Sequence, residues 1–476
     1  MIRIANSQVR WFTLLFMRRP GPMKPREGLK VGVVTTIVPG AESLEMLEET
    51  VRALVAMEYP HDTWVLDEGD DERVREICRR SGAFHFSRKR LAGCQTGDGA
   101  FKARSKHGNY NAWLYEIGFD RYEIITAFDP DHVPVQSFLS NVLGYFDDPS
   151  VGYVQAPQAY YNQGASFIAR GAAEETYEYY SCAQMAANYF GLPAVVGSHN
   201  THRVTALKEV SGFAPHDADD LLIGLLYQSH GWLGVYVPRI LARGLTPVDW
   251  NGYLTQQHRW ARSVVDIRCR LHQLVGDGVP LIGKILSALH GVFYLQYSIT
   301  TLIGLLLLAY MLVTGSAPKV INPFILPKLA LLVVTLSICA FFRQRFYLDP
   351  MSEWGLHWRA DLLRYAKWPV FLWGVWDVAV GRHVPYALTP KLEADKPSYM
   401  LLIPHMLVIV LMSTACVAGL LSGNRAPSLL YLVTAVVVMA SVSLILTHRL
   451  NFPAPYDGNL LSDQWLGEVN IPRQDG

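Results

Sequence analysis

The sequence predicts an α/β domain followed by a helical membrane region. From about residue 28 to residue 250, short β-branched apolar runs alternate with helical stretches, which is typical of a mostly parallel sheet with helical crossovers. Between Ile285 and Lys319 no charged side chain occurs, and the apolar runs there and beyond are long enough to cross a bilayer. Half of the residues are hydrophobic, so one water-facing domain plus a membrane portion accounts for the composition.

Five strands and one helix are expected in the α/β domain. The strands are Lys30–Val38, Thr63–Leu66, Ala83–Ser87, Glu123–Phe128 and Gly152–Gln155, and the helix is Leu44–Met57. Helical crossovers predict a parallel sheet, which binds ligands at the carboxyl ends of its strands. Acidic clusters follow Leu66 and Phe128, so we expect the site at that edge.

Four membrane spans are expected, one around Leu302–Leu312 and the others at Phe324–Phe342, Met400–Leu421 and Ser428–Thr447. Lys328 would cost about 2.5 to 3.5 kcal/mol at mid-bilayer, so it should lie near a helix end. The Trp-rich segment His357–Gly381 should lie in the headgroup plane, because its charges disfavour the alternative of a fifth span.

Basic residues gather on the side of the membrane that carries the α/β domain, which makes that side cytoplasmic and the protein a multi-pass plasma (inner) membrane protein. The expected parts are an N-terminal interfacial segment over 1–27, a cytosolic domain over 28–275, a membrane region over 276–450 and a cytosolic tail over 451–476. The short apolar patch Trp11–Met17 is interpreted as an interfacial anchor or as the remaining part of a longer segment.

Charge and cysteine usage exclude some classes of partner. The chain has 42 basic and 41 acidic residues, so a nucleic-acid partner is not expected. Its six cysteines show no CxxC spacing, which disfavours a zinc site and a disulfide framework.

Two acidic motifs follow predicted strands whose ends we expect to be neighbours. These are Asp67 in Leu66-Asp67-Glu68-Gly69 and the pair Asp129 and Asp131 in Asp129-Pro130-Asp131. Sugar transfer from a nucleoside diphosphate needs a divalent cation to neutralise the departing diphosphate, and hard cations prefer carboxylate oxygens. A DxD triplet alone is often only an acidic turn, but here an apolar strand runs directly into it.

A third acidic motif, Ala218-Asp219-Asp220, precedes an apolar helical run. Inverting transfer needs a base to take the proton of the acceptor hydroxyl, and Asp220 is our candidate. The alternative is that Asp217 or Asp219 merely caps the helix.

The string Gln256-Gln257-His258-Arg259-Trp260 comes next. On a helix, Gln256, Arg259 and Trp260 share one face. Gln and Arg can bind sugar hydroxyls and diphosphate oxygens, and an indole can stack on a pyranose ring. By itself such a string is usually only an amphipathic helix.

In this order, the four motifs resemble the D, DxD, TED and QxxRW series of processive family 2 glycosyltransferases such as cellulose, chitin and hyaluronan synthases. Residues 106–111 are similar to the KxGNxN element of these enzymes, and residues 385–391 resemble the FxVTxKG gating loop of cellulose synthases. The sequence departs from the pattern of these enzymes at two places. The third motif is ADD in place of TED, and residues 194–200 stand where cellulose synthases carry FFCGS.

The resemblance implies a GT-A type catalytic domain, a nucleotide-sugar donor with UDP-glucose favoured, a β-linked polysaccharide acceptor, Mg²⁺ or Mn²⁺, and a product that leaves through the membrane. An accessory subunit is a further candidate partner beside the lipid bilayer. The implied base is Asp220 and the implied metal ligand is Asp131. The implied acceptor residues are Trp260 and Asp219, and the implied donor residues are Asp67, Glu42, Lys106, Asp129, Gln256, Arg259, Thr389 and Lys391.

Two other functions stay open. One is a non-processive transferase that adds a single sugar to a lipid carrier or another acceptor. The other is a catalytically inactive polytopic binding or transport protein.

Overall fold

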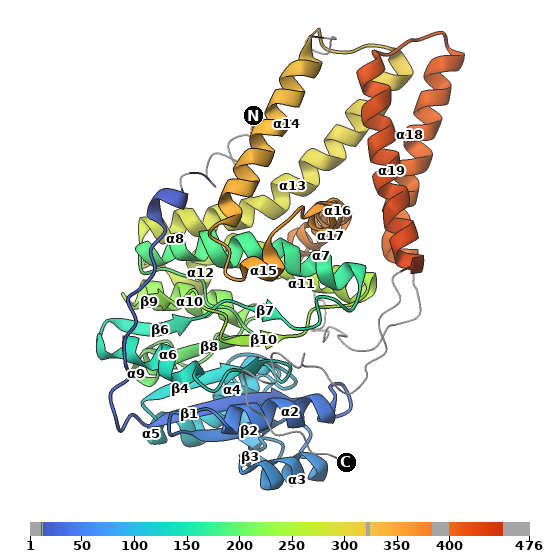
Figure 1. The fold of residues 1–476 in the computed structure, drawn as a ribbon. Helices are drawn as coiled ribbons and strands as arrows, with labels where there is room; N and C mark the ends of the chain where they lie inside the picture. The colour runs from blue at the N-terminus through green and yellow to red at the C-terminus, as the bar shows by residue number, and fades with distance from the viewer. Residues whose placement is uncertain (1–10, 12, 320–323, 383–398, 451–476) are drawn as a thin grey trace.

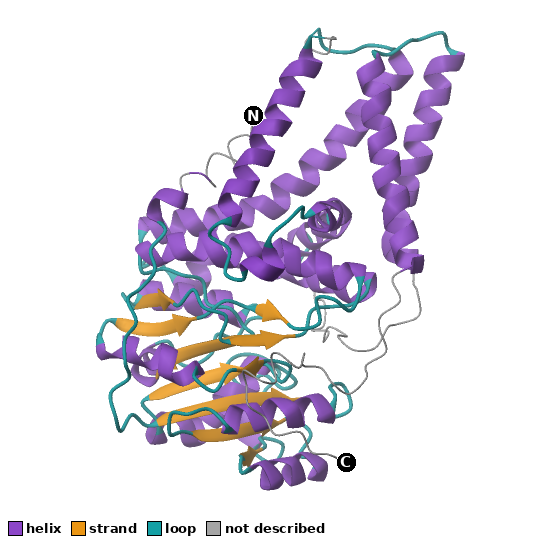
Figure 2. Cartoon of the chain, viewed as in Figure 1, coloured by secondary structure: helices purple, strands orange, loops and turns teal. Residues whose placement is uncertain are grey.

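The computed structural model describes residues 11, 13–319, 324–382 and 399–450, and it has two layers (Figure 1). An α/β domain forms the base, and long helices rise from one side of it. Figure 2 shows the strands confined to the base, with further helices between the strands and the long helices. The expected order of an α/β domain followed by a helical membrane region is therefore confirmed.

The main sheet has seven strands among the described residues, in the order β3-β2-β1-β4-β8-β6-β9. Neighbouring strands pair in parallel except β8, which runs antiparallel to both β4 and β6. The strands are β1 (Val31–Ile37), β2 (Asp62–Asp67), β3 (Phe84–Phe86), β4 (Ile124–Phe128), β6 (Val151–Gln155), β8 (His199–Arg203) and β9 (Leu233–Tyr236).

The five strands predicted from the sequence are confirmed, and their ends agree to within one residue. Two strands of the main sheet, β8 and β9, were not predicted. The sequence of β8, His-Asn-Thr-His-Arg, lacks the apolar run that marks a buried strand, although its first four residues are buried. Because only β8 runs antiparallel in the described part of the main sheet, the prediction of a mostly parallel sheet is confirmed.

A second sheet of three short strands lies beside the first, in the order β5-β10-β7. Its strands are β5 (Val133–Pro134), β7 (Ala159–Tyr160) and β10 (Ala242–Gly244). β5 follows directly from the loop after β4, so this small sheet flanks the carboxyl edge of the main sheet.

Helices cover both faces of the main sheet. Those of the α/β domain are α2 (Leu44–Val55), α3 (Glu72–Ser81), α4 (Lys106–Trp113), α5 (Phe119–Arg121), α6 (Phe138–Val142), α7 (Phe167–Glu178), α8 (Gln184–Tyr189), α9 (Val204–Glu209), α10 (Asp219–Ser229), α11 (Trp250–Cys269) and α12 (Leu271–Val275). Short 3₁₀ or π turns are η1 (Ala92–Cys94), η2 (Leu114–Gly118), η3 (Leu143–Asp147), η4 (Tyr179–Ala183) and η5 (Tyr399–Leu402).

Local sequence signals set the ends of these helices. Ser43 caps α2 by accepting the N–H of Met46, and Asp249 caps α11 by accepting the N–H of Gly252. α3 ends at Gly82, whose φ of +79° is the left-handed conformation that favours glycine. The predicted helix Leu44–Met57 is thus confirmed as α2, two residues shorter at its end.

Four helices in the described part of the chain are long and apolar enough to cross a membrane, as predicted. They are α13 (Leu281–Thr314), α14 (Ile325–Gln344), α18 (Ile403–Leu421) and α19 (Ser428–Leu450). The 34 residues of α13 measure about 50 Å at 1.5 Å per residue, well beyond the ~30 Å hydrocarbon core, so part of α13 lies outside it.

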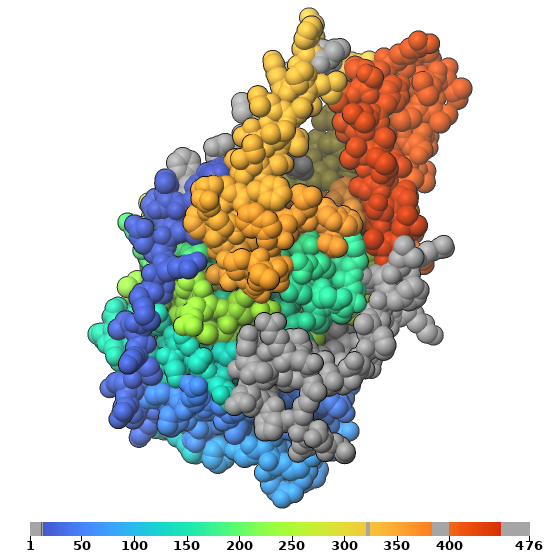
Figure 3. Space-filling view, viewed as in Figure 1, coloured from blue at the N-terminus to red at the C-terminus, as the bar shows by residue number. Residues whose placement is uncertain are grey.

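α14 stands apart from the other spans. None of the residues in its most apolar stretch is buried, and Figure 3 shows a hollow between α14 and the pair α18 and α19. Lys328 is the fourth residue of α14, so it lies near the helix end, as expected.

The Trp-rich segment forms two short helices, α16 (Trp358–Ala366) and α17 (Trp368–Ala379), after the single turn α15 (Pro350–Glu353). With 9 and 12 residues they are too short to span a bilayer, so the structure gives no support to a fifth span. Trp358, Trp373 and Trp376 are each at least half exposed, which suits the membrane interface.

The membrane-side helices share a hydrophobic core with the α/β domain. Trp250 and Tyr253 of α11 pack with Tyr294 of α13, Leu363 of α16 and Phe371 of α17 in one buried cluster. At Gly374 the backbones of α17 and α11 come together, and a Cβ there would lie 3.1 Å from the N of Arg262. The two parts are therefore packed as one body.

Ion pairs reinforce this junction. Three glutamates of α7 face basic residues from the membrane-side helices. The pairs are Glu174 with Arg359 (3.2 Å), Glu175 with Lys367 (2.8 Å) and Glu178 with Arg343 (3.4 Å). Glu174 and Glu175 are buried or nearly so, and such pairs are costly to break because one charge is left unpaired.

The N-terminal segment runs along the side of both layers. The Trp11 ring lies 6.2 Å from that of Phe342 in α14, and the N–H of Arg18 donates to the carbonyl of Met185 in α8. Further along, the hydroxyl of Tyr145 donates to the carbonyl of Gly21. Whether this segment anchors the chain in lipid stays a prediction.

Gly374→Leu should destabilise the protein, because the leucine would force α17 away from the backbone of α11. Overpacking of this kind costs about 1 to 3 kcal/mol, and the expected readout is a lower Tm of the protein in detergent micelles. Gly304→Leu is the matched control, since a Cβ at Gly304 of α13 meets nothing within 4 Å. Equal Tm values for the two variants would contradict this account of the junction.

Candidate active site

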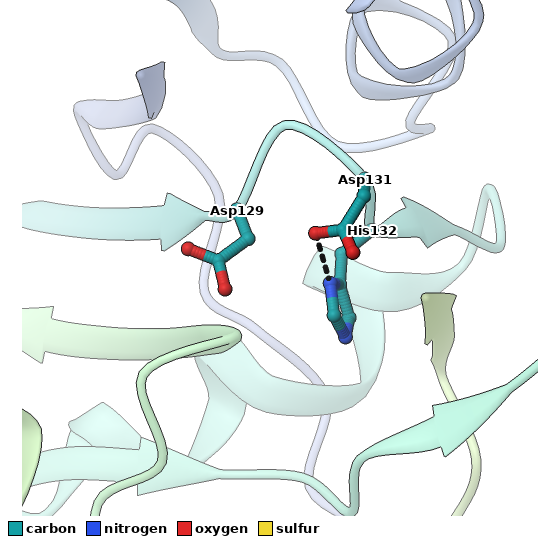
Figure 4. A group of neighbouring side chains, drawn as sticks. All are labelled: Asp129, Asp131 and His132. Carbon is teal, nitrogen blue, oxygen red and sulfur yellow. Dashed lines mark hydrogen bonds and ion pairs between the residues drawn. The ribbon is translucent and has the colours of Figure 1, made fainter. Parts of the chain in front are cut away.

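The candidate site lies where β4 reaches the carboxyl edge of the main sheet (Figure 4). Asp129 follows the last residue of β4, and its N–H donates to the carbonyl of Ser198, which precedes β8. The following turn is fixed from the other side, because the hydroxyl of Thr50 in α2 donates to the carbonyl of Pro130 at 2.7 Å. The DxD triplet is thus held in a defined loop.

Asp129, Asp131 and His132 form a cluster that could hold a metal ion. One ligand atom from each lies within 4.8 Å of the others. Nδ1 of His132 lies 3.0 Å from Oδ1 of Asp131, and the N–H of Leu245 donates to Oδ2 of Asp131 at 3.3 Å. Carboxylate oxygens with one imidazole nitrogen suit a divalent cation such as Mg²⁺ or Mn²⁺, so the donor set fits the implied metal.

The small sheet supports this cluster. A Cβ on Gly244 of β10 would overlap the imidazole of His132, so glycine leaves the space that the ring fills. His132 is fully buried and Asp131 is nearly so, whereas the Asp129 side chain keeps 26% of its surface exposed. Asp129 is therefore the member of the cluster that faces an incoming ligand most openly.

Lys106 joins this cluster to a second part of the chain. It is the first residue of α4, and its Nζ donates to Oδ1 of Asp129 at 2.6 Å and to the carbonyl of Gly197 at 2.7 Å. Burial acts to lower the pKa of Lys106, but the charge of Asp129 outweighs it and holds this pKa well above its ordinary value. Lys106 is therefore a fixed cation beside the DxD loop.

Gly197 connects Lys106 to the predicted base. Its N–H donates to Oδ2 of Asp220 at 2.7 Å, while Oδ1 of Asp220 accepts the N–H of Leu221. A Cβ on Gly197 would lie 3.0 Å from Oδ2 of Asp220, so a larger residue would disturb this contact. Lys106, Asp129, Gly197 and Asp220 thus form one connected group.

The environment of Asp220 makes it a weaker acid. Burial, and then the neighbouring charge of Asp219, raise the pKa of Asp220 to about 6. Burial likewise raises the pKa of Asp219. A carboxylate with a pKa near 6 is a better proton acceptor than an ordinary aspartate at neutral pH.

Neither Asp217 nor Asp219, the two residues considered as caps, is the N-cap of α10. The N-cap of α10 is Ala218, which makes no side-chain capping hydrogen bond. Asp217 instead accepts a hydrogen bond from Arg262 of α11, so it ties the loop before α10 to the helix that carries the QxxRW string.

Asp67 lies on the same edge of the sheet, but not beside Asp129. β1 lies between β2 and β4, so the two acidic motifs follow strands that are not neighbours, contrary to prediction. Asp67 is fully buried, and its carboxylate accepts the N–H groups of Gly69 and Asp71. Nε2 of His85 lies 3.1 Å from it. In this state Asp67 shapes its own loop, and its role in donor binding stays a prediction.

Glu42 lies beyond the end of β1, where its Oε2 accepts the N–H of Val38 at 2.8 Å. It therefore closes the turn that follows β1. This turn lies at the same carboxyl edge as Asp67, and a direct contact of Glu42 with a nucleotide stays a prediction.

The QxxRW string lies within α11 and has the expected open face. Gln256 and Arg259 are partly exposed and Trp260 is 38% exposed, whereas Gln257 between them is buried. Nε2 of His258 lies 3.0 Å from Oδ2 of Asp377 in α17. The string thus lies on a helix that contacts both the loop before α10 and the membrane-side helix α17.

Thr389 and Lys391 lie outside the described residues, as does the whole segment that resembles a gating loop. Their contact with the donor stays a prediction.

Sequence reasoning missed His132 and Gly197. His132 directly follows the DxD triplet, so a histidine beside two aspartates was the available signal for a third ligand. Gly197 acts through its backbone, and only the folded chain reveals which carbonyl and N–H it offers.

A family model described as "Glycosyltransferase like family 2" matches residues 32–263. Two curated relatives are cellulose synthase catalytic subunits [UDP-forming]. That of Xanthomonas axonopodis pv. citri is 27% identical over 288 residues, which cover 58% of this chain and 38% of that protein. That of Pseudomonas fluorescens is 27% identical over 332 residues, which cover 67% of this chain and 43% of that protein. The chain thus matches about two fifths of the length of these relatives.

A solved structure shares the fold. It is a mannosyltransferase from Pyrobaculum calidifontis in complex with GDP-Man and Mn²⁺, with a TM-score of 0.53 and 17% identity. The match covers 79% of this chain and 95% of that one. The α/β domain therefore has the GT-A fold that the motifs implied.

Asp131→Asn and His132→Ala should each weaken the binding of Mn²⁺ by at least about tenfold, since even outer partners of a metal site contribute 10- to 100-fold. Isothermal titration of the purified full chain with Mn²⁺ measures the change. Asp120→Asn is the control, because the Asp120 side chain is 95% exposed in a helix away from the cluster. Unchanged Mn²⁺ affinity in both site variants would show that the cluster holds no metal.

Proposed function

We propose that this chain is a cellulose synthase-like family 2 glycosyltransferase that extends a β-linked polysaccharide with sugar from a nucleotide sugar, UDP-glucose by preference. The observation that carries the proposal is the connected group of Lys106, Asp129, Gly197 and Asp220. It brings a fixed cation, a candidate metal ligand and a candidate base together at the edge where GT-A domains bind ligands.

The donor side of the site is built from Lys106 and the DxD loop. Asp129, Asp131 and His132 would hold Mg²⁺ or Mn²⁺, which when bound neutralises the charge of the departing diphosphate. Lys106 places a second positive charge within 2.6 Å of Asp129, so it can attract the same diphosphate. Asp67, Glu42, Gln256 and Arg259 complete the proposed donor site, with Thr389 and Lys391 from the segment outside the described residues.

Asp220 is the proposed base. Its raised pKa suits the removal of a proton from the acceptor hydroxyl, and the N–H groups of Gly197 and Leu221 orient its two oxygens. The hydroxyl oxygen then attacks the anomeric carbon of the donor sugar, the bond to the diphosphate breaks, and the diphosphate carries away the bonding electrons. Attack from the opposite side gives inversion, hence a β linkage from an α-linked donor.

The acceptor side points toward the membrane-side helices. Trp260 exposes 38% of its surface on α11, and its indole suits stacking on the terminal sugar of the polymer, with Asp219 as a second contact. α11 packs against α13 and α17, so a chain held at Trp260 would leave toward the spans. We propose that the polymer crosses the plasma (inner) membrane there, from a cytoplasmic catalytic domain, with or without an accessory subunit.

Membranes that contain the full chain should incorporate label from UDP-[¹⁴C]glucose into a polymer, in the presence of Mn²⁺ or Mg²⁺. UDP-N-acetylglucosamine and GDP-mannose complete the panel, and linkage-specific hydrolases identify the product. Asp220→Asn should lower kcat by about 10² to 10⁴, the usual contribution of a general base. Asp120→Asn should leave kcat unchanged, because that side chain lies on the surface.

The product separates the remaining functions. A single labelled sugar on a lipid would replace the processive proposal by a non-processive transferase. If the Tm shows that the protein is folded and it still turns over no donor, the proposal is refuted and an inactive binding or transport protein is favoured.

The pH dependence tests the base directly. Since Asp220 accepts a proton only when ionised, kcat/KM should rise with pH through about 6 and level off above it. Asp219→Asn removes the neighbouring negative charge that helps to raise the pKa of Asp220, so the rise should shift to lower pH. A profile that is flat from pH 5 to 7, or a shift to higher pH in Asp219→Asn, would contradict the assignment.

A further inference from the structure

A buried arginine joins the two ends of the proposed donor site. Arg88 is fully buried, and its guanidinium forms a bidentate pair with Glu68, with Nε and Nη2 each 2.9 Å from a carboxylate oxygen. The remaining N–H groups donate to four backbone carbonyls, at 3.0 to 3.3 Å, those of Cys94, Phe101, Lys102 and Ser105. All five N–H donors of a guanidinium are thus used, which a lysine could not reproduce.

The partners of Arg88 adjoin the two proposed donor residues. Glu68 directly follows Asp67, and the N–H of Glu68 continues the pairing with the end of β1. Ser105 directly precedes Lys106 and caps α4 by accepting the N–H of Gly108. Arg88 therefore connects the loop of Asp67 with the helix start that presents Lys106 to Asp129.

The contact between Arg88 and the start of α4 leaves no room for a side chain at position 108. A Cβ on Gly108 would overlap the carbonyl of Lys102 and press against Nη1 of Arg88. The backbone of α4 can therefore approach the guanidinium only because this position is glycine.

Backbone strain gathers around the same pair. Among the described residues, the non-glycine residues with positive φ are Asp70, Arg104 and Ser211. Two of them, Asp70 and Arg104, flank the Arg88–Glu68 pair, and the N–H of Arg104 donates to Oε1 of Glu68 at 3.1 Å. Strained conformations persist only where the surroundings hold them, and they cluster at binding and catalytic sites.

We infer that Arg88 is a positioning residue for donor binding. With Glu68 it fixes the spacing between Asp67 and Lys106, and it wraps residues 94–105 around its guanidinium as one wall of the nucleotide site. The inference rests on the proposed function, since it assigns a role in binding the nucleotide sugar. It predicts that damage to this pair weakens the donor complex while Asp220 and the chemical step stay intact.

Arg88→Lys keeps the positive charge and loses the fork that binds Glu68 and the four carbonyls. It should raise the KM for the donor roughly 10- to 100-fold, the cost of a small displacement of binding groups, with kcat within about threefold of wild type. The Kd of UDP, measured by isothermal titration of the full chain with Mn²⁺ present, should rise by a similar factor. Glu68→Gln, which removes the carboxylate partner, should do the same.

Arg203→Lys is the matched control. Arg203 also binds several backbone carbonyls, those of Val151, Phe146 and Asp148, but it lies at the end of β8 that pairs with the start of β4, away from the site. It should lower Tm about as much as Arg88→Lys and leave both the donor KM and the Kd of UDP unchanged.

The outcomes separate the inference from the proposed function. A wild-type chain that neither binds a nucleotide nor turns over any donor refutes the proposed function, and the inference falls with it. An active wild type whose Arg88→Lys and Glu68→Gln variants keep the wild-type KM and Kd refutes the inference alone. Loss of the folded domain in both variants also refutes it, because the pair would then serve the fold alone.

Discussion

Lys106 is the cation that holds separate parts of the chain together at one point. Its Nζ reaches Asp129 at the end of β4 and the carbonyl of Gly197 before β8, and the N–H of Gly197 reaches Asp220 at the start of α10. The Lys106 side chain is only 23% exposed, and its ion pair with Asp129 and its hydrogen bond to the carbonyl of Gly197 offset the loss of hydration. Conversely, the carboxylates of Asp129, Asp219 and Asp220 gather there with less repulsion because a positive charge lies among them. The position of the DxD loop relative to the candidate base thus depends on this one side chain.

Glycines let the backbone lie close to neighbouring groups, both in the site and at the junction with the membrane-side helices. Gly244 leaves room for the ring of His132, Gly197 allows contact with Asp220, and Gly374 brings α17 onto α11. At each of these positions a Cβ would press on a neighbour, and the contact at Gly374 joins α11 to the membrane-side helix α17. The buried cluster of α11, α13, α16 and α17 and the glutamates of α7 continue the same contact, which holds the α/β domain and the membrane-side helices in fixed positions relative to each other.

The charged side chains near the carboxyl edge of the main sheet differ in their surroundings, and their roles differ accordingly. Around Asp220, burial and a like charge raise the pKa toward neutrality, which favours proton transfer. Around Asp67, two backbone N–H groups and His85 satisfy the carboxylate, so it organises its loop. Arg88 connects the loop of Asp67 with the start of α4 without facing a ligand, because all its N–H groups are used within the protein. The three charged side chains thus differ in role according to which partners they have.

The sequence alone determined the order of the two layers, five strands, four spans and the acidic motifs, because apolar periodicity and short motifs are local properties of the chain. It also placed Gln256, Arg259 and Trp260 on one helix face, which needs only the helical repeat. The antiparallel β8, the insertion of β1 between β2 and β4, and the roles of His132, Gly197 and Arg88 were decided by the tertiary structure. These features arise from strand order and from backbone groups of residues far apart in the chain, and neither leaves a pattern in the sequence. A polar strand such as β8 is buried only because its neighbours satisfy its hydrogen bonds, and that becomes known only when the whole sheet is assembled.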